Sequence, residues 1–208
     1  MDRNVILVLI FIVLAILFSI TVKFVKKHYS TKIVRLLEER KFDEFDQLIE
    51  TFIIKILFMP FNIDYMKLNS AILRDNKKMI LQAFEKFEKH RLNHKQKSLI
   101  YMMAFNYYVS VEDQKHAKKY LNLVIDLKDE QMVKEATRIY DIYIEKGDRY
   151  LEEILEETKN LPVEHRGVNE FLISIMYENK KNHKKAKEYR ELSETHIAML
   201  DELLKAKK

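Results

Sequence analysis

Apolar and polar residues alternate along most of the chain with the period of an α-helix. Tyr101, Ala104, Phe105 and Tyr108 stand at i, i+3, i+4 and i+7, which puts them on one face of a helix. Short polar breaks, at residues 110–113, 146–149 and 179–182, separate such stretches. The same spacing recurs in later stretches, at Leu121, Val124 and Ile125, at Ile139, Ile142 and Tyr143, and at Phe171, Leu172, Ile175 and Met176. Long helices joined by short breaks predict antiparallel helix hairpins.

The N-terminal stretch has a different pattern. Residues 4–22 form a run of 19 residues without a charge, and residues 5–18 are apolar throughout. At about 1.5 Å per residue this run spans roughly 28 Å, close to the hydrocarbon core of a bilayer. We therefore predict a transmembrane anchor with its basic flank at residues 1–26. A cleaved signal peptide fits less well, because the apolar run is long and no Ala-x-Ala pattern follows it. A buried core helix fits less well again, because every side of the segment is apolar.

The charges around this anchor predict its orientation. Lys23, Lys26 and Lys27 follow the apolar run, and the larger Lys/Arg cluster normally stays in the cytoplasm. The expected product is a single-pass protein of the cell membrane with a cytoplasmic C-terminal domain. No Gly or Pro separates residues 22 and 40, so the anchor helix can continue into the first soluble helix. A break at residues 28–31 is equally compatible with the sequence.

Composition narrows the class of protein. The chain of 208 residues has a net charge of +5, and residues 1–35 alone hold six Lys or Arg and one Asp. The remainder is neutral, so no basic footprint for nucleic acid is expected. Two Gly, two Pro and no Cys disfavour sheets and tight turns and exclude thiolate chemistry. An all-α fold is predicted, and the Lys-, Ile- and Asn-rich composition is typical of a bacterial protein from an AT-rich genome.

A sequence repeat runs through the C-terminal part of the chain. Ala117 and Ala186 occupy matching positions and are separated by two periods of roughly 34.5 residues. The stretch 147–154, which begins with Gly147 and Asp148, lies halfway between them, and Ala83 stands one period before Ala117. A partial unit follows Phe42, at a spacing stretched by an insert around Pro60.

At these residues the sequence resembles the tetratricopeptide repeat (TPR), a helix–turn–helix unit of 34 residues. The match is best from Tyr101 to Leu127. Phe105 departs from it, because the motif has a small residue there, and Lys181 replaces the turn glycine. The residues that carry this match are Tyr101, Tyr108, Ala117, Leu121 and Val124.

The resemblance implies an α-solenoid of about four helix hairpins at residues 61–208, closed by a C-terminal capping helix. Residues 27–60 would then form a linker helix and a partial first hairpin. It also implies a partner-binding groove lined by the first helix of each hairpin. The groove candidates are Tyr65, Leu68, Ile72, Leu99, Met102, Asn106, Val109, Lys134, Thr137, Asp141, Val168, Phe171 and Ile175. They are mostly apolar, which favours an apolar peptide or helix as ligand.

No pattern of catalytic residues stands out. His90 and His94 have the spacing of two metal ligands but fall near a predicted turn, so no metal site and no cofactor are expected. Glu152, Glu153, Glu156 and Glu157 are expected to form a solvated helix face rather than an acid–base pair. The lysines at 180–187 and 115–119 are expected to be solvated, with contact to lipid headgroups or to the acidic stretch as alternatives.

The sequence therefore predicts a non-enzymatic, membrane-tethered TPR-like adaptor that binds a protein or peptide partner. The alternative is a structural subunit of a membrane complex that contacts its partners through the transmembrane helix. The bilayer is a further expected partner, whereas nucleic acids and small-molecule substrates are not.

Overall fold

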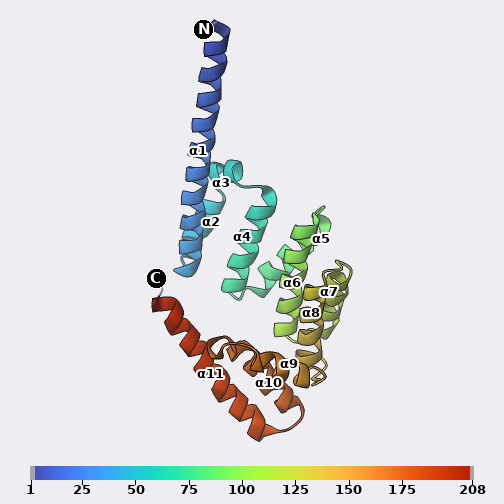
Figure 1. Cartoon of the computed structure of the whole chain (residues 1–208). Helices are drawn as coiled ribbons and strands as arrows, with labels where there is room; N and C mark the ends of the chain where they lie inside the picture. The colour runs from blue at the N-terminus through green and yellow to red at the C-terminus, as the bar shows by residue number, and fades with distance from the viewer. Residues whose placement is uncertain (1–2, 207–208) are drawn as a thin grey trace. The chain divides into compact units, whose positions relative to one another are not determined.

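The computed structural model describes residues 3–206, with the side chains of residue 12 and of residues 14–206. Within this part of the chain all regular structure is helical, so the predicted all-α class is confirmed (Figure 1). The elements are α1 (Arg3–Glu38), α2 (Phe42–Ile49), α3 (Phe52–Leu57), α4 (Pro60–Leu73), α5 (Lys77–Lys89), α6 (His94–Ser110), α7 (Gln114–Ile125), α8 (Glu130–Tyr143), α9 (Leu151–Lys159), the 3₁₀ helix η1 (Val163–His165), α10 (Gly167–Asn179) and α11 (His183–Ala206).

Helix α1 carries the predicted anchor and runs unbroken to Glu38, so the helix does not end at residues 28–31. The prediction of a membrane span covers residues 1–26, and the side chains of residues 1–11 and 13 lie outside the described part. Among the residues that are described, no helix is both long enough and apolar enough to cross a bilayer.

Five helix pairs are joined by turns that contain a left-handed residue. In each pair a residue two or three positions after the end of the first helix has a positive φ, between 52° and 59°. These residues follow one another at intervals of 34 to 37 along the chain: Arg40, Asp75, Glu112, Lys146 and Lys181. The pairs are α1/α2, α4/α5, α6/α7, α8/α9 and α10/α11. A left-handed residue at this place is a common way to end a helix.

Four of these turns share one hydrogen-bond pattern. The N–H after the left-handed residue donates to the carbonyl five residues earlier, at 2.8 to 2.9 Å. The donor–acceptor pairs are Lys41 to Leu36, Asn76 to Ala71, Asp113 to Tyr108 and Asn182 to Tyr177. In three turns the same donor residue then caps the next helix with its side chain, namely Asn76, Asp113 and Asn182. One short sequence therefore ends one helix and starts the next.

The core is repeated with the turns. The residue four positions before each left-handed residue is buried, and so is the residue five positions after it. The first set is Leu36, Ala71, Tyr108, Ile142 and Tyr177, and the second is Phe45, Ile80, Ala117, Leu151 and Ala186. In the α4/α5 pair the residue equivalent to Ala117 is therefore Ile80, three positions before the predicted Ala83.

Replacing Lys181 with Gly should stabilise the protein by about 0.5–1 kcal/mol, because φ of Lys181 is 59° and only Gly adopts this region without cost. The measurement is denaturant unfolding of the purified chain in detergent. Lys187→Gly is the matched control, since Lys187 lies inside α11 and the same change should destabilise there by about 1 kcal/mol. Equal effects of the two substitutions would contradict the left-handed turn.

The chain divides into two compact units, residues up to His90 and residues from Arg91. The boundary follows α5, whereas the sequence analysis placed its domain boundary at residue 60. In the first unit α1 packs on α2 and α3, and α4 packs on α3 and α5. The buried cluster of α1, α2 and α3 consists of Ile33, Leu36, Phe45, Ile49, Ile54 and Phe58.

The second unit contains three helix pairs and η1. The closest pair is α10/α11, where a Cβ at Gly167 would lie 2.6 Å from Ile197 Cγ1 and 3.1 Å from the Ser193 carbonyl oxygen. The Ser193 hydroxyl donates to the Gly167 carbonyl at 2.7 Å. The C-terminal segment is not a separate capping helix, because α11 runs without a break from His183 to Ala206.

Candidate functional site

The first helices of the three pairs in the second unit lie next to one another. Helix α8 contacts both α6 and α10. A pocket of about 560 Å³ lies between α8, α9 and α10, and one of about 250 Å³ lies between α6 and α8. Gln131 and Glu135 line both pockets, so the two form one continuous surface. The TPR resemblance also placed its predicted groove on the first helices of the pairs.

The lining of this surface is mainly apolar, with amides and charges interspersed. Val168 is 66% exposed and Phe171 is 40% exposed, although both are large apolar residues. Met102 and Met132 line the smaller pocket, and methionine side chains adapt readily to an apolar partner. We call this set the α8 groove: Met102, Asp129, Gln131, Met132, Lys134, Glu135, Arg138, Ile139, Tyr143, Glu157, Val168, Asn169, Phe171 and Leu172.

The predicted groove residues fall into three groups. Leu68, Val109 and Asp141 are buried, so they are removed from the residues that a partner could touch. Met102, Lys134, Val168 and Phe171 line the α8 groove. The other candidates are at least partly exposed and lie outside these two pockets: Tyr65, Ile72, Leu99, Asn106, Thr137 and Ile175. Tyr65 and Ile72 belong to the first unit.

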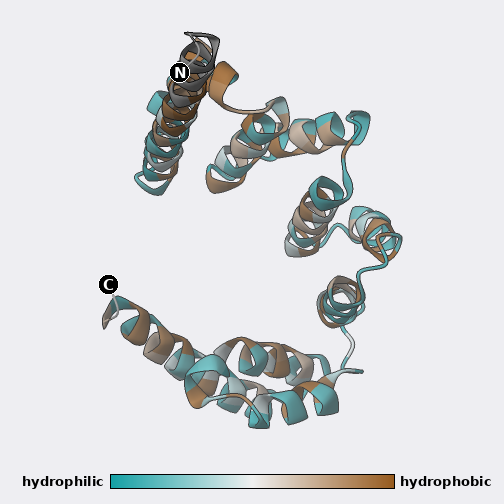
Figure 2. Cartoon of the chain, turned by 45° about the horizontal axis from the view of Figure 1, so that its top comes forward, coloured by the Kyte–Doolittle hydropathy of each residue, from teal (hydrophilic) through white to brown (hydrophobic). Residues whose placement is uncertain are grey.

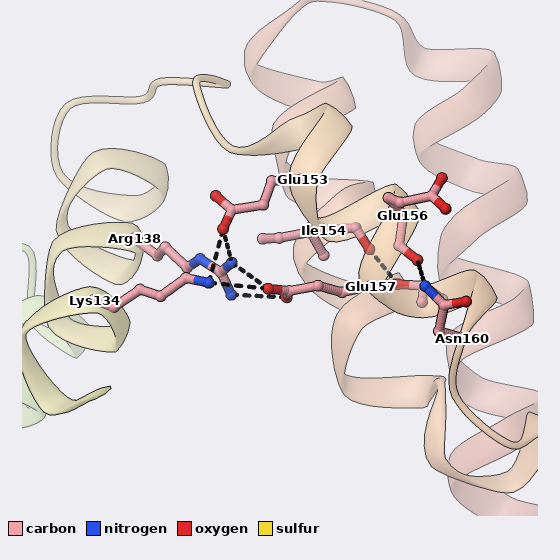
Figure 3. Close-up of polar contacts among 8 residues, drawn as sticks. Lys134, Arg138, Glu153, Ile154, Glu156, Glu157 and Asn160 are labelled. Carbon is pink, nitrogen blue, oxygen red and sulfur yellow. Dashed lines mark hydrogen bonds and ion pairs between the residues drawn. The ribbon is translucent and has the colours of Figure 1, made fainter. Parts of the chain in front are cut away.

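One wall of the groove is a cluster of ion pairs between α8 and α9 (Figure 3). Arg138 Nη2 lies 2.6 Å from Glu157 Oε1 and 2.7 Å from Glu153 Oε1. Lys134 Nζ lies 2.8 Å from the same Glu153 oxygen and 3.2 Å from the same Glu157 oxygen. The Arg138 guanidinium also lies 5.8 Å from the centre of the Tyr150 ring. We call Lys134, Arg138, Glu153 and Glu157 the α8–α9 ion cluster.

The ion cluster shifts the pKa of each member toward its charged form. Hydrogen bonding from Arg138 lowers the pKa of Glu157, and hydrogen bonding from Lys134 lowers the pKa of Glu153. The reverse contacts raise the pKa of Lys134 and Arg138. All four groups are therefore charged at neutral pH, and neither carboxyl group is held protonated as a general acid would be. The arrangement is suited to holding α8 and α9 together.

These contacts change the interpretation of the acidic stretch. Glu153 and Glu157 pair with α8, whereas the sequence analysis expected a solvated face. Glu156 pairs with Lys159 in its own helix. The stretch does not pair with the lysines at 180–187, of which Lys180 contacts Asp148 instead. Sequence reasoning missed Arg138, although its spacing of four residues from Lys134 puts both cations on one helix face.

Glu157→Gln should lower the melting temperature at about pH 7 by up to roughly 3 °C, because a partly exposed ion pair contributes about 1 kcal/mol or less. The depressed pKa of Glu157 means that this stability is present above the unfolded pKa and is lost as pH falls through the folded pKa. The difference between variant and wild type should therefore vanish in acid. The measurement is thermal unfolding by circular dichroism, with Glu164→Gln as control outside the cluster. A difference that stays constant while the carboxyl groups become protonated in acid would contradict the ion-pair explanation.

Asp141 has a structural role next to the groove. The turn after α8 differs from the other four, with the Gly147 N–H donating to the Asp141 carbonyl at 2.8 Å. A Cβ at Gly147 would lie 2.5 Å from Asp141 Oδ2, so any other residue there would force the buried Asp141 side chain to move. The Asn179 side chain donates to the carbonyls of Ile142 and Gly147, at 2.9 and 2.8 Å, and ties the turn to α10.

The two histidines with metal-ligand spacing do not share a helix face. His90 caps the end of α5 and His94 begins α6. Within the described residues, no group of three or more His, Asp or Glu is arranged to hold a metal ion. Several lysines of the predicted basic clusters contact aromatic rings, as Lys118 does with Tyr140 at 4.8 Å.

Comparison with known proteins adds no assignment. The chain matches no family model, no curated protein and no solved structure. Any statement of function therefore depends on the groove and on the sequence pattern.

Proposed function

We propose that this protein is a membrane-tethered adaptor of TPR-like helix hairpins, with no enzymatic role, that binds a peptide segment of a partner protein. The α8 groove is the observation that carries the proposal. It combines exposed Val168 and Phe171 with the amides of Gln131 and Asn169. An apolar peptide could cover the first two while its backbone bonds to the amides.

The ion pairs of the groove also favour an apolar rather than an acidic ligand. Lys134 and Arg138 are already paired with Glu153 and Glu157, so their charges are largely neutralised. An acidic peptide would have to compete with both carboxylates. A partner that covers Val168 and Phe171 gains apolar contact without breaking those pairs.

The proposed anchor gives the groove its place in the cell. The uncharged run at residues 4–22 and the basic flank at Lys23, Lys26 and Lys27 support a cytoplasmic domain held at the membrane. The repeated turns support the TPR-like interpretation of the hairpins. A tether raises the local concentration of a membrane-associated partner, so a modest affinity of the groove is sufficient.

Site-specific photo-crosslinking in native membranes tests the proposal. A benzophenone amino acid replaces Phe171 in one variant, Met102 in a second and exposed Asn122 on α7 in a third. We expect the first two positions to crosslink the same segment of one protein and the Asn122 position to give no such product. In a second experiment Val168, which lies in α10, is replaced by Asp. Val168→Asp should abolish the crosslink from Met102, which lies in α6.

Two results would count against this function. A product that forms equally from Asn122 would show that the groove is not the binding surface. Replacement of residues 1–26 by an unrelated anchor tests the alternative of a structural subunit. If the crosslink is lost although the protein remains in the membrane, the transmembrane helix itself contacts the partner.

A further inference from the structure

Helix α3 turns large apolar side chains away from the protein. Phe52 is 78% exposed and Ile56 is 62% exposed, and their spacing of four residues puts them on one face. Met59, in the connection to α4, is 68% exposed. On the other side of the segment, Ile54 and Phe58 are buried in the cluster with α1 and α2. A group of exposed large apolar residues on so short a segment indicates contact with something apolar.

The position of α3 along α1 indicates what it contacts. Helix α3 packs on α1, and Lys26 Nζ lies 5.4 Å from the centre of the Phe58 ring. Lys26 follows the end of the uncharged run by four residues, which is about 6 Å of helix. Figure 1 shows α3 beside α1 and nearer to the N-terminus than α2 is. The exposed face of α3 therefore lies at the level where α1 would leave the bilayer.

The neighbouring surface of α1 has the composition of a membrane interface. Ile20 and Phe24 are exposed, at 57% and 75%, and continue the apolar surface toward the N-terminus. Lys23 and Lys27 stand beside them and are exposed. Figure 2 shows brown, hydrophobic ribbon on the short segment beside α1. Apolar side chains next to lysines are typical of helices that lie in the headgroup region of anionic membranes.

We propose that α3 is an interfacial helix, with Phe52, Ile56 and Met59 inserted into the lipid surface around the anchor. This inference rests on the proposed membrane tether. It adds a second point of attachment, since α1 alone would leave the first unit free to rotate about the helix axis. With α3 in the interface, one side of the first unit faces the membrane and the α4/α5 pair is held in a fixed orientation to the bilayer.

The chain has no cysteine, so single cysteines can report depth in the full-length protein. Ile56→Cys is labelled with an environment-sensitive nitrobenzoxadiazole dye in vesicles of phosphatidylcholine and phosphatidylglycerol. A doxyl group near the headgroup end of the acyl chain serves as quencher. Phe18→Cys probes the predicted span. Asp43→Cys is the water control, because Asp43 is exposed and follows the end of α1, about 24 Å of helix beyond Val22.

We expect quenching of the Ile56 probe by the doxyl lipid to be at least about twofold stronger than quenching of the Asp43 probe. Quenching at Phe18 with none at Ile56 would overturn the interfacial helix and leave the tether intact. No quenching at either position would overturn the tether as well. A dye at Ile56 that is shielded from aqueous iodide and unaffected by doxyl lipid would overturn the lipid assignment, because a protein surface would then cover α3.

Discussion

Phe105→Ala is expected to destabilise the second unit by about 3–5 kcal/mol, a large part of the stability of a domain of this size. The Phe105 side chain is fully buried in α6, which packs on both α7 and α8. Removing the ring loses its apolar burial and leaves a cavity that helices in contact on both sides close only in part. Denaturant unfolding in detergent, followed by circular dichroism, measures the loss.

Two further variants keep this result interpretable. Phe105→Leu retains most of the volume and should cost no more than about 1.5 kcal/mol, so it reports a graded effect if the Ala variant fails to fold. Phe52→Ala is the matched control, because the same ring is removed from a side chain that is 78% exposed. It should change stability by less than about 0.5 kcal/mol. Equal losses for Phe105→Ala and Phe52→Ala would contradict the burial of Phe105.

Phe105 also shows what the repeat pattern could and could not predict. The sequence marked it as a departure from the TPR motif, which has a small residue there. The structure places it in the core, with the fully buried Ala104 and Ala117 nearby in the same helix pair. Equivalent places in three of the other four pairs hold Ile33, Leu68 and Ser174, all buried, whereas Ile139 in the fourth is half-buried and lines the α8 groove. Periodicity therefore predicted that the position faces inward, but not how much volume it holds.

The turns were predicted in place, but their mechanism was not visible in the sequence. The short polar breaks were expected where three of the five helix pairs are joined, α6/α7, α8/α9 and α10/α11, because polar residues interrupt the helical pattern. A left-handed residue is usually Gly, and here the five positions hold Arg, Asp, Glu and Lys. The equivalence of Arg40 and Asp75 with the other turn residues therefore appears only from their φ angles and hydrogen bonds, whereas the repeat pattern had already placed Lys181 at the turn.

The sequence named some of the residues that line the candidate site, but it did not predict the ion pairs there. The resemblance placed a groove on the first helices of the pairs, and Met102 and Lys134 do line pockets there. Asp141 was predicted to line the groove but is buried. A sequence does not show that its carboxylate packs inward against Gly147. Arg138 was missed because its significance depends on Glu153 and Glu157, which belong to a different helix. Contacts between helices distant in sequence carry no local signal.

Leu14→Arg with Leu17→Arg is expected to release the protein from the membrane almost completely. Both residues lie near the middle of the uncharged run at residues 4–22, and each arginine there costs about 2.5–3.5 kcal/mol on the insertion scale. The insertion cost of Leu17→Arg is lower than that of Leu14→Arg, because residue 17 lies further from the centre of the run. The two substitutions together still cost about 4–6 kcal/mol, which is enough to prevent stable insertion of a single span. Carbonate extraction of membranes, followed by immunoblotting of pellet and supernatant, measures the fraction that remains integral.

The matched control is Leu14→Val with Leu17→Val, which keeps the run apolar and should leave the protein in the pellet. The α3 face makes the result more specific. A chain without the anchor would still have Phe52, Ile56 and Met59 to contact lipid, but a few interfacial side chains give reversible binding that carbonate removes. The arginine pair should therefore move the protein to the supernatant even though α3 is unchanged. If wild-type protein is itself extracted by carbonate, the run at residues 4–22 does not span the bilayer, and both the tether and the membrane contact of α3 fail with it.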